Sequence, residues 1–306
     1  MADQAHGKSV QTTGHAWDGD LQEFNNPLPA WWLWAFYATV LFALVYWVLY
    51  PAWPVGRDFT KGVNSVTFER NGEQVTTHWN TRAALAAEMQ SGELSLRQRE
   101  YFERVAAASF DDIRNDPEMM AFARSTAKVL FADNCAACHG SGGVPATAGL
   151  YPNLADDAWL WGGTPEQIEQ TLIQGRLGFM PPFRQTLTDA ELEQVAHYVL
   201  SLSGGEVDAG KAAAGRDIFQ TDKGGCYLCH TQAGTGLVSQ GAANLTDAIW
   251  TVADVSGAPD AGTRVERVVE VIRDGIQRVM PAWDERLTPG QIKMLAVYVH
   301  SLGGGT

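Results

Sequence analysis

The hydrophobic pattern of this 306-residue chain is dominated near its start by one long apolar run. Residues Trp31 to Tyr50 form a stretch of twenty positions without a charged side chain. At a rise of about 1.5 Å per residue, a helix of that length reaches about 30 Å, which is the thickness of a bilayer's hydrocarbon core. Tryptophans at both ends, such as Trp31 and Trp53, are typical of membrane interfaces. The pattern predicts a transmembrane helix within residues 31–53.

A cleaved signal peptide is the alternative interpretation of this run. Such a peptide has a shorter apolar region, which follows a basic stretch and ends in a small-residue cleavage site. Pro27-Leu28-Pro29 precedes the run and Pro51-Ala52-Trp53-Pro54 follows it, and neither has these features. We therefore expect an uncleaved, single-pass anchor, preceded by residues 1–30 as a separate segment.

Two later segments have the apolar spacing of amphipathic helices. Each follows a Leu-Thr pair, so Thr188 and Thr288 are the predicted N-caps. Apolar residues then recur at i, i+3, i+4 and i+7 in both segments, namely Leu192, Val195, Ala196, Val199, Ile292, Leu295, Ala296 and Val299. We expect these residues to be core, and Tyr198 and Tyr298 to pack against the first helix of the domain. Those first helices are predicted around Ala127 to Ala132 and Gly215 to Gln220.

Residues 54–120 are predicted to be a linker region with a hairpin and a helix. Val66 to Val75 has strand-like runs on both sides of Asn71-Gly72, which is the typical centre of a two-residue hairpin turn. After Asn80 the composition becomes helical. We find no residues for site chemistry in this region.

The part of the chain that follows is a duplication. The residue pairs 91 positions apart are Cys135/Cys226, His139/His230, Asn153/Asn244, Leu154/Leu245 and Trp159/Trp250. The residue pairs 100 positions apart include Gly175/Gly275, Met180/Met280, Thr188/Thr288 and Tyr198/Tyr298. The difference between the two offsets falls after Trp250, where residues 256–262 are predicted to form an inserted surface loop. The repeat predicts two domains, 121–205 and 206–306.

All four cysteines belong to two CxxCH motifs. These are Cys135-Ala136-Ala137-Cys138-His139 and Cys226-Tyr227-Leu228-Cys229-His230. Two thiols at this spacing can both add to the vinyl groups of one porphyrin, and the adjacent histidine can reach its iron. The alternatives are two disulfides or a zinc site, but a zinc finger pairs one CxxC with a distant HxxxH. The motifs predict two covalently attached haem c groups with His139 and His230 as axial ligands.

Met180 and Met280 are the candidate second axial ligands. Each stands in a Met-Pro-X-aromatic context, where proline stiffens an extended loop that can hold a thioether over a haem face. The methionines in helix-like runs are weaker candidates, because methionine often fills an apolar face there; these are Met89, Met119, Met120 and Met294. His197, on one of the last helices, is expected to be a surface or packing residue. We predict a mainly α fold, with one N-terminal transmembrane helix followed by two tandem class I cytochrome c domains.

The net charge of the chain, −13, limits its partners. Four of the 35 acidic residues precede Pro51, and of the 22 basic residues only Lys8 does, so the remainder holds 31 acidic and 21 basic residues and a net charge of −10. Such a surface repels nucleic acid and favours a basic partner, such as a soluble cytochrome c. The alternative is that this charge serves solubility alone.

Two arguments about membrane orientation conflict. Lys8 precedes the apolar run while Arg57 and Lys61 follow it, so the positive-inside rule weakly places the C-terminus inside the cell. Haem attachment to CxxCH motifs, as the c-type cytochrome class implies, takes place outside the bacterial inner membrane, and large domains translocate largely regardless of charge. We expect residues 1–30 in the cytoplasm and the two haem domains in the periplasm.

The chain resembles the di-haem subunit of the cbb3-type cytochrome c oxidases over nearly its whole length. The segments that carry the resemblance are Trp17 to Trp32 before the anchor, Tyr50 to Pro54 and Phe59-Thr60-Lys61-Gly62-Val63 after it, and Val129 to Gly140 around the first haem motif. Residues 64–80 look longer and more polar than the corresponding stretch of the family.

The resemblance implies a role within an oxidase complex of the bacterial cell inner membrane. Electrons would come from a periplasmic cytochrome c or a bc1 complex, and would pass through the two haems toward a mono-haem c subunit and the catalytic haem-copper subunit. Oxygen reduction and proton pumping would belong to that catalytic subunit, so no catalytic residue is predicted in this chain. Three alternatives stay open: a di-haem subunit of another respiratory enzyme, such as a dehydrogenase or a nitric oxide reductase; a di-haem peroxidase; and a haem-based gas sensor.

Overall fold

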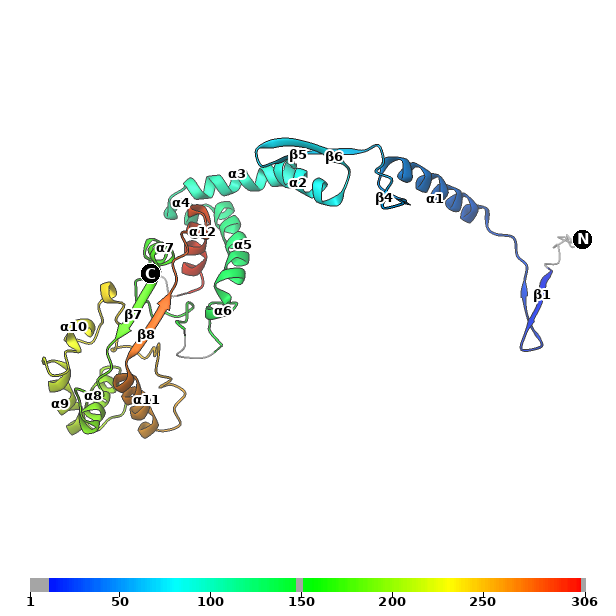
Figure 1. The fold of residues 1–306 in the computed structure, drawn as a ribbon. Helices are drawn as coiled ribbons and strands as arrows, with labels where there is room; N and C mark the ends of the chain where they lie inside the picture. The colour runs from blue at the N-terminus through cyan, green and yellow to red at the C-terminus, as the bar shows by residue number, and fades with distance from the viewer. Residues whose placement is uncertain (1–10, 147–150, 304–306) are drawn as a thin grey trace, which may run out of the picture. The chain divides into compact units, whose positions relative to one another are not determined.

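The computed structural model describes residues 11–146 and 151–303 (Figure 1). The first ten residues of the predicted cytoplasmic segment and the last three glycine and threonine positions lie outside the described residues. The chain divides into two compact units that meet between Arg97 and Gln98.

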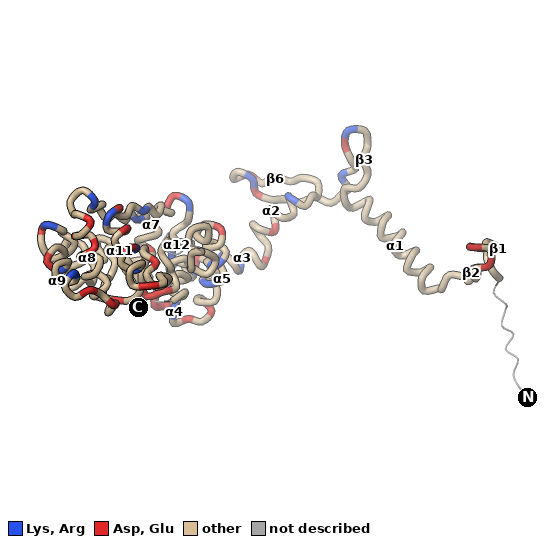
Figure 2. The backbone as a smooth tube through the Cα atoms, turned by 90° about the horizontal axis from the view of Figure 1, so that it is seen from below, with Lys and Arg blue, Asp and Glu red and all other residues tan. Residues whose placement is uncertain are grey.

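The first unit contains the predicted membrane helix as α1, Ala30–Leu49. Pro29 precedes the helix, and Tyr50 is its C-cap residue. The Tyr50 N–H donates to the Tyr46 carbonyl at 2.8 Å, and Pro51 follows Tyr50 in the chain. Figure 2 shows no charged residue along α1, and none of its side chains is buried. Within the part of the chain that the structure describes, α1 alone is long and apolar enough to cross a membrane. Its bounds agree with the predicted run to within one residue at each end.

Among its described residues, the first unit also contains three antiparallel hairpins and a second helix. The hairpins are β1 (Thr12–Trp17) with β2 (Leu21–Phe24), β3 (Pro54–Val55) with β4 (Asp58–Phe59), and β5 (Ser65–Arg70) with β6 (Glu73–His78). The last of them is the hairpin that Asn71-Gly72 predicts, and both turn residues have positive φ. Helix α2, Thr81–Ser91, starts at Asn80, whose side chain accepts a hydrogen bond from Ala83 N. The β1–β2 hairpin was not predicted, because all of its residues are exposed and no buried face marks it in the sequence.

The second unit is mainly helical, as predicted. Helix α3 (Glu93–Ala107) leads into it from the first unit. The elements of the first repeat are α4 (Phe110–Asn115), α5 (Pro117–Asn134), α6 (Ala136–His139), α7 (Pro165–Gln174), β7 (Arg176–Met180) and α8 (Asp189–Leu202). Those of the second repeat are α9 (Ala209–Phe219), α10 (Tyr227–His230), a 3-10 turn (Val238–Gln240), α11 (Ala261–Asp274), β8 (Ile276–Met280) and α12 (Pro289–His300).

The two last helices begin at the predicted caps. The Thr188 hydroxyl accepts from Glu191 N and the Thr288 hydroxyl from Gln291 N, both at 3.4 Å. The Glu191 and Gln291 side chains accept in turn from the N–H of the cap residue, which completes a capping box in each repeat. The apolar residues predicted as the core faces of α8 and α12 are all buried.

The second unit has two hydrophobic cores, and each combines helices from both repeats. The first lobe packs α12 against α5 and α7, and Tyr298 lies 5.4 Å from Phe131 between ring centroids. The second lobe packs α8 against α9 and α11, and Tyr198 lies 5.2 Å from Phe219. Figure 1 shows the red α12 beside the green α5, with α11 at the other end of strand β8. The last helices of the two repeats have therefore exchanged places.

Strands β7 and β8 carry the chain from one lobe to the other. The two strands pair antiparallel, with Gly178 opposite Arg278 at the middle of the ribbon. They therefore run in opposite directions between the two lobes. Beyond the ribbon, Phe183 N donates to the Ile272 carbonyl of α11 at 3.1 Å, and Trp283 N donates to the Leu172 carbonyl of α7 at 2.9 Å. These two hydrogen bonds are equivalent by the 100-residue offset and fix each crossing segment to the other repeat.

This exchange differs from the domain boundaries inferred from the sequence. The expected domains, 121–205 and 206–306, are continuous, whereas each core takes its last helix from the other repeat. The physical reason is that α8 and α12 present the same apolar face, so sequence pattern alone does not select their partner helix. The short connection of residues 203–208 favours packing of α8 on α9, because consecutive elements joined by short loops are usually neighbours.

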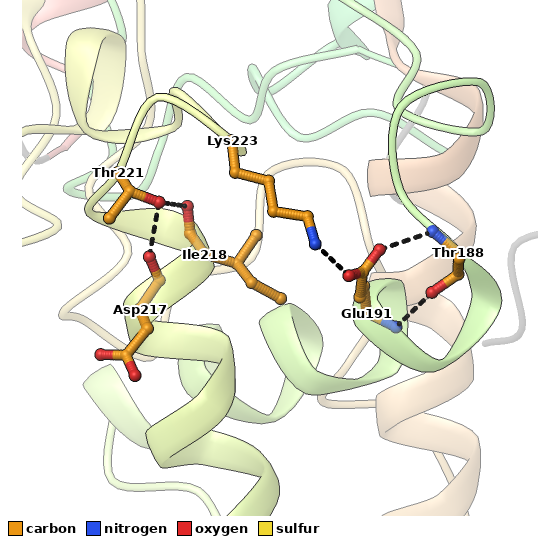
Figure 3. A network of polar contacts seen from close by, with 6 residues as sticks. All are labelled: Thr188, Glu191, Asp217, Ile218, Thr221 and Lys223. Carbon is orange, nitrogen blue, oxygen red and sulfur yellow. Dashed lines mark hydrogen bonds and ion pairs between the residues drawn. The ribbon is translucent and has the colours of Figure 1, made fainter.

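Polar contacts lock α8 to α9 in the second lobe. The buried His197 ring accepts a hydrogen bond from Asp208 N at 3.2 Å through Nδ1, and Lys211 Nζ lies 2.6 Å from Glu193 Oε1. Figure 3 shows Lys223, in the turn after α9, bonded to the Glu191 carboxylate. Lys223, together with the hydrogen bonds from Thr188, lowers the pKa of Glu191 from 4.5 to about 2. His197 is thus a packing residue, as expected.

Gly215→Ala tests the contact between α9 and α8. A Cβ at this position would overlap the Gln194 carbonyl of α8. At an open helix position the change from glycine to alanine stabilises by about 1 kcal/mol, so here we expect instead a net loss of about 1–3 kcal/mol from overpacking. Guanidinium unfolding, followed by haem absorption, measures the effect. The control is Ala213→Gly at an exposed position of α9, which should cost about 1 kcal/mol from helix propensity alone. A stabilised Gly215→Ala chain would contradict the packing.

Glu191→Gln tests the ion pair with Lys223 through its pH dependence. Because the folded pKa of Glu191 is depressed, the pair stabilises the fold above pH 4.5, and this stabilisation is lost as the pH falls toward about 2. The variant should melt at a lower temperature than the wild-type chain at neutral pH, and the gap should close in acid. Glutamine preserves the cap, as Gln291 does in the second repeat. Asp189→Asn, which removes a carboxylate of the same turn without touching Lys223, should show no such closing gap.

Candidate functional site

The first CxxCH motif lies on a single helical turn at the end of α5. Cys135 N donates to the Phe131 carbonyl at 2.8 Å, and His139 N donates to the Cys135 carbonyl at 2.9 Å. Side chains three and four positions apart lie on the same face of a helix, so the turn brings Cys138 and His139 next to Cys135. Cys135 is half-buried and Cys138 is exposed, and both thiols are free.

The second motif repeats this arrangement in α10. His230 N donates to the Cys226 carbonyl at 2.9 Å, Cys226 is half-buried, and Cys229 is exposed. Burial raises the pKa of the inner thiols, Cys135 and Cys226, to about 11. The inner thiols are therefore protonated at neutral pH, unlike the depressed-pKa cysteines that act as catalytic nucleophiles.

The two motif histidines are held by equivalent hydrogen bonds. His139 Nδ1 lies 3.0 Å from the Pro152 carbonyl, and His230 Nδ1 lies 2.9 Å from the Ala243 carbonyl. A carbonyl can only accept, so Nδ1 carries the proton and Nε2 keeps its lone pair. Burial lowers the pKa of both rings, which favours the neutral form. This is the orientation and protonation state of a metal-binding histidine whose second nitrogen is fixed by a backbone carbonyl.

A cavity opens beside the second motif. Its empty space is about 760 Å³, including the part open to solvent, and it is lined by Cys226, His230 and Met180. The remaining wall is mostly apolar, with side chains from both repeats that include Val199, Phe219, Leu245, Trp250 and Ile272. Apolar walls, a free imidazole nitrogen and a thioether fit a planar macrocycle with an iron at its centre. The donors of the site therefore suit a haem.

The first lobe gathers the corresponding residues. Met280, Cys135, Leu154 and Trp159 are partly buried and pack against the core that contains α5, α7 and α12. Met280 thus joins the lobe of the first CxxCH motif, and Met180 joins that of the second. The two methionines are the last residues of strands β7 and β8, opposite Ile276 and Arg176 respectively.

The other candidate methionines occupy structural positions. Met294 is fully buried in the first core, and Met119 and Met120 pack against that core from α5. Met89 is exposed on α2 in the first unit. Met180, by contrast, lines the cavity that His230 also lines.

The sequence did not reveal the carbonyl groups that orient the histidines. Pro152 and Ala243 are unlike residues, and the interaction uses only their backbone. The sequence signal for these loops was the asparagine that follows each of the two residues, Asn153 and Asn244. The two asparagines form equivalent turns, in which the side-chain oxygen accepts a hydrogen bond from the N–H two positions on, at 3.0 Å in each. A repeated turn at equal distance from each CxxCH motif marks the loop that holds the ring.

Comparison with protein families gives two matches along the chain. Residues 9–57 match the N-terminal domain of cytochrome oxidase-cbb3, FixP. Residues 122–199 and 210–299 match the family described as cytochrome c oxidase, cbb3-type, subunit III. The two parts of the second match correspond to the two sequence repeats, and together they span more than half of the chain.

Curated relatives extend the similarity to the whole length. The chain is 43% identical to a cbb3-type cytochrome c oxidase subunit FixP of Azorhizobium caulinodans, over 96% of this chain and 93% of the relative. It is 43% identical to the subunit of the same name in a Bradyrhizobium species, with both chains covered completely. It is also 38% identical to a cbb3-type cytochrome c oxidase subunit CcoP of Cereibacter sphaeroides, over 96% of this chain and 95% of the relative.

Proposed function

The chain belongs to the subunit III family of the cbb3-type cytochrome c oxidases, and we propose that it carries electrons through two haem c groups, one at each CxxCH motif. It is an electron-transfer subunit of an oxidase of this class, whose catalytic reaction is the reduction of oxygen. The observation that carries the two-haem proposal is a pair of equivalent hydrogen bonds. They engage Nδ1 of His139 and His230 and leave each Nε2 with its lone pair, beside four cysteines that form no disulfide.

Each motif supplies the attachment and the first axial ligand. Cys135 and Cys138 would hold one haem and Cys226 and Cys229 the other, through thioether bonds to the vinyl groups. His139 and His230 would bind the irons through Nε2, and Met180 and Met280 would supply the second ligands. When bound, haem c supplies a one-electron iron couple, and a methionine opposite the histidine raises its potential.

The chain itself would hold no catalytic site. Burial raises the pKa of the Cys135 and Cys226 thiols, whereas a catalytic nucleophile needs a lowered pKa. Met180 would close the second axial position beside His230 against oxygen. Oxygen reduction would then take place in the haem-copper subunit, with a mono-haem c subunit as the other partner.

A periplasmic cytochrome c or a bc1 complex would be the electron donor. The net charge of −10 beyond the membrane helix favours a basic donor, because complementary fields speed the encounter of two proteins. Figure 2 shows acidic residues distributed over both lobes of the second unit.

Helix α1 would anchor the chain in the bacterial inner membrane by a single pass. Haem attachment outside that membrane supports a cytoplasmic N-terminus and periplasmic haem domains. The helix exposes large apolar and aromatic side chains along its whole length, including Trp34, Leu41 and Phe42, which suits contact with lipid and with a membrane-spanning partner subunit.

Purification of the complex tests the assignment to the oxidase. The chain is extracted from membranes in mild detergent through a tag on its C-terminus. We expect haem b, haem c and copper in the sample, and oxygen consumption with reduced cytochrome c. Haem c without copper or oxygen uptake would move the chain to another respiratory enzyme and would leave the two-haem carrier intact.

Removal of one attachment site tests the number of haems. Cys135→Ala with Cys138→Ala should halve the covalent haem c per chain, and the equivalent change at Cys226 and Cys229 should do the same. Pyridine haemochrome spectra and the mass of the intact chain report the count. Ala137→Ser, which changes the first motif without removing a thiol, is the control and should keep two haems. Unchanged haem in either double variant would contradict the attachment site.

A further inference from the structure

We propose that the hairpin of β1 and β2 docks on a basic cytoplasmic loop of a membrane-spanning oxidase subunit. The inference rests on the function proposed above, which puts residues 1–30 in the cytoplasm and the chain in an oxidase complex, and it adds a contact that this segment makes there. The family match over residues 9–57 includes the hairpin together with α1. Exposure, residue pattern, charge and the short link to α1 all support this contact.

The hairpin has no core of its own. Every residue of β1 and β2 is exposed, and the large side chains of Trp17, Leu21 and Phe24 are 56%, 67% and 66% exposed. A two-stranded hairpin is at best marginally stable in water unless one of its faces is covered. A partner that covers these apolar side chains therefore stabilises the hairpin.

An apolar pair lies next to the turn of the hairpin, with acidic residues around it. Trp17 pairs directly with Leu21 across the two strands, so both side chains lie on the same face. Asp18 and Asp20 lie in the turn between them, and Glu23 alternates onto the face of Leu21. A large aromatic residue with polar and charged residues at its rim is typical of protein–protein interfaces.

The charge of the hairpin selects the kind of partner. The described residues hold no Lys or Arg before Arg57, whereas the hairpin carries three acidic residues, drawn in red in Figure 2. Cytoplasmic loops of membrane-spanning proteins carry an excess of Lys and Arg, so the hairpin has the opposite charge to the loops of a neighbouring subunit. The anionic lipids of the cytoplasmic leaflet, by contrast, repel it. A protein loop is therefore favoured over the lipid surface.

The link to α1 keeps the hairpin close to the membrane. Residues 25–29 separate Phe24 from Ala30, and five fully extended residues span at most about 18 Å. Pro27 and Pro29 restrict the backbone of this link further, because the proline ring fixes φ. The hairpin can therefore reach only protein that lies near the point where α1 enters the membrane.

Photo-crosslinking in intact membranes identifies what the hairpin touches. The probe p-benzoylphenylalanine is placed at Leu21 in the full chain and, as a control, at the similarly exposed Leu85 of α2. We expect the Leu21 probe to crosslink to a Lys- and Arg-rich cytoplasmic loop of a membrane-spanning oxidase subunit, mapped by mass spectrometry of the joined peptides. The Leu85 probe should not reach that loop. Crosslinks from Leu21 to lipid alone, or none at all, would overturn the docking.

Neutral variants test whether charge guides the contact. The first variant removes the three negative charges of the hairpin: Asp18→Asn, Asp20→Asn and Glu23→Gln. It should lower the yield of the Leu21 crosslink severalfold, and high salt should do the same for the unchanged hairpin, because exposed charges are screened. The matched control neutralises three exposed acidic residues beyond the membrane helix: Glu73→Gln, Glu100→Gln and Glu103→Gln. The control should keep the full yield. An undiminished yield in the hairpin variant would refute a basic partner loop.

The outcomes separate this proposal from the one it rests on. Haem c per chain is measured in every variant and should stay unchanged, because the hairpin belongs to the first unit and both CxxCH motifs to the second. A missing Leu21 crosslink in a complex that still contains haem b, haem c and copper overturns the docking alone. A crosslink to a periplasmic loop overturns the proposed orientation and the docking with it. Absence of haem b and copper overturns the oxidase assignment itself.

Discussion

The contacts of Tyr298 with Phe131 and of Tyr198 with Phe219 mark the packing on which the rest of the second unit depends. Helices α8 and α12 are buried along most of their length, and apolar burial is the largest favourable term in folding. Their choice of partner helix therefore decides where the segments that precede them must run. Because each last helix packs on the first helix of the other repeat, the β7–β8 ribbon has to cross, and both Met-Pro segments end in the opposite lobe.

The histidine side of each site is local, whereas the methionine side depends on this exchange. Within one repeat, a helical turn positions the CxxCH residues, and a carbonyl thirteen positions beyond the histidine orients the ring. These parts need only short-range contacts and are the same in both lobes. The thioether, by contrast, arrives on a strand from the other repeat. In the proposed function, each site would thus combine a local part that holds the histidine with a methionine whose position depends on long-range packing.

The sequence was sufficient for the elements that local preferences decide. The uncharged run gave α1 to within a residue, Asn71-Gly72 gave the β5–β6 turn, and Thr188 and Thr288 gave the caps, because each depends on local side-chain and backbone preferences. The attachment cysteines and axial histidines were named from the CxxCH spacing, and the axial methionines from their Met-Pro context; all of them stay predictions. The partner of α8 could not be read, since a duplicated pattern fits its own repeat as well as the other. The one clue to this partner was the short connection of residues 203–208, because it leaves α9 as the nearest helix on which α8 can pack.

The exchange of the last helices also determines the order in which the two cores can form during synthesis. A ribosome makes the chain from the N-terminus, and domains that are continuous in sequence can fold as they emerge. The core of the first lobe, however, contains Met294, Leu295 and Val297 of α12, which are made after all the residues of the second lobe's core. The first lobe therefore completes its core only when α12 is made, whereas the second core contains no α12 residue. A nascent or C-terminally shortened chain would leave the first CxxCH motif, not the second, without its final cover.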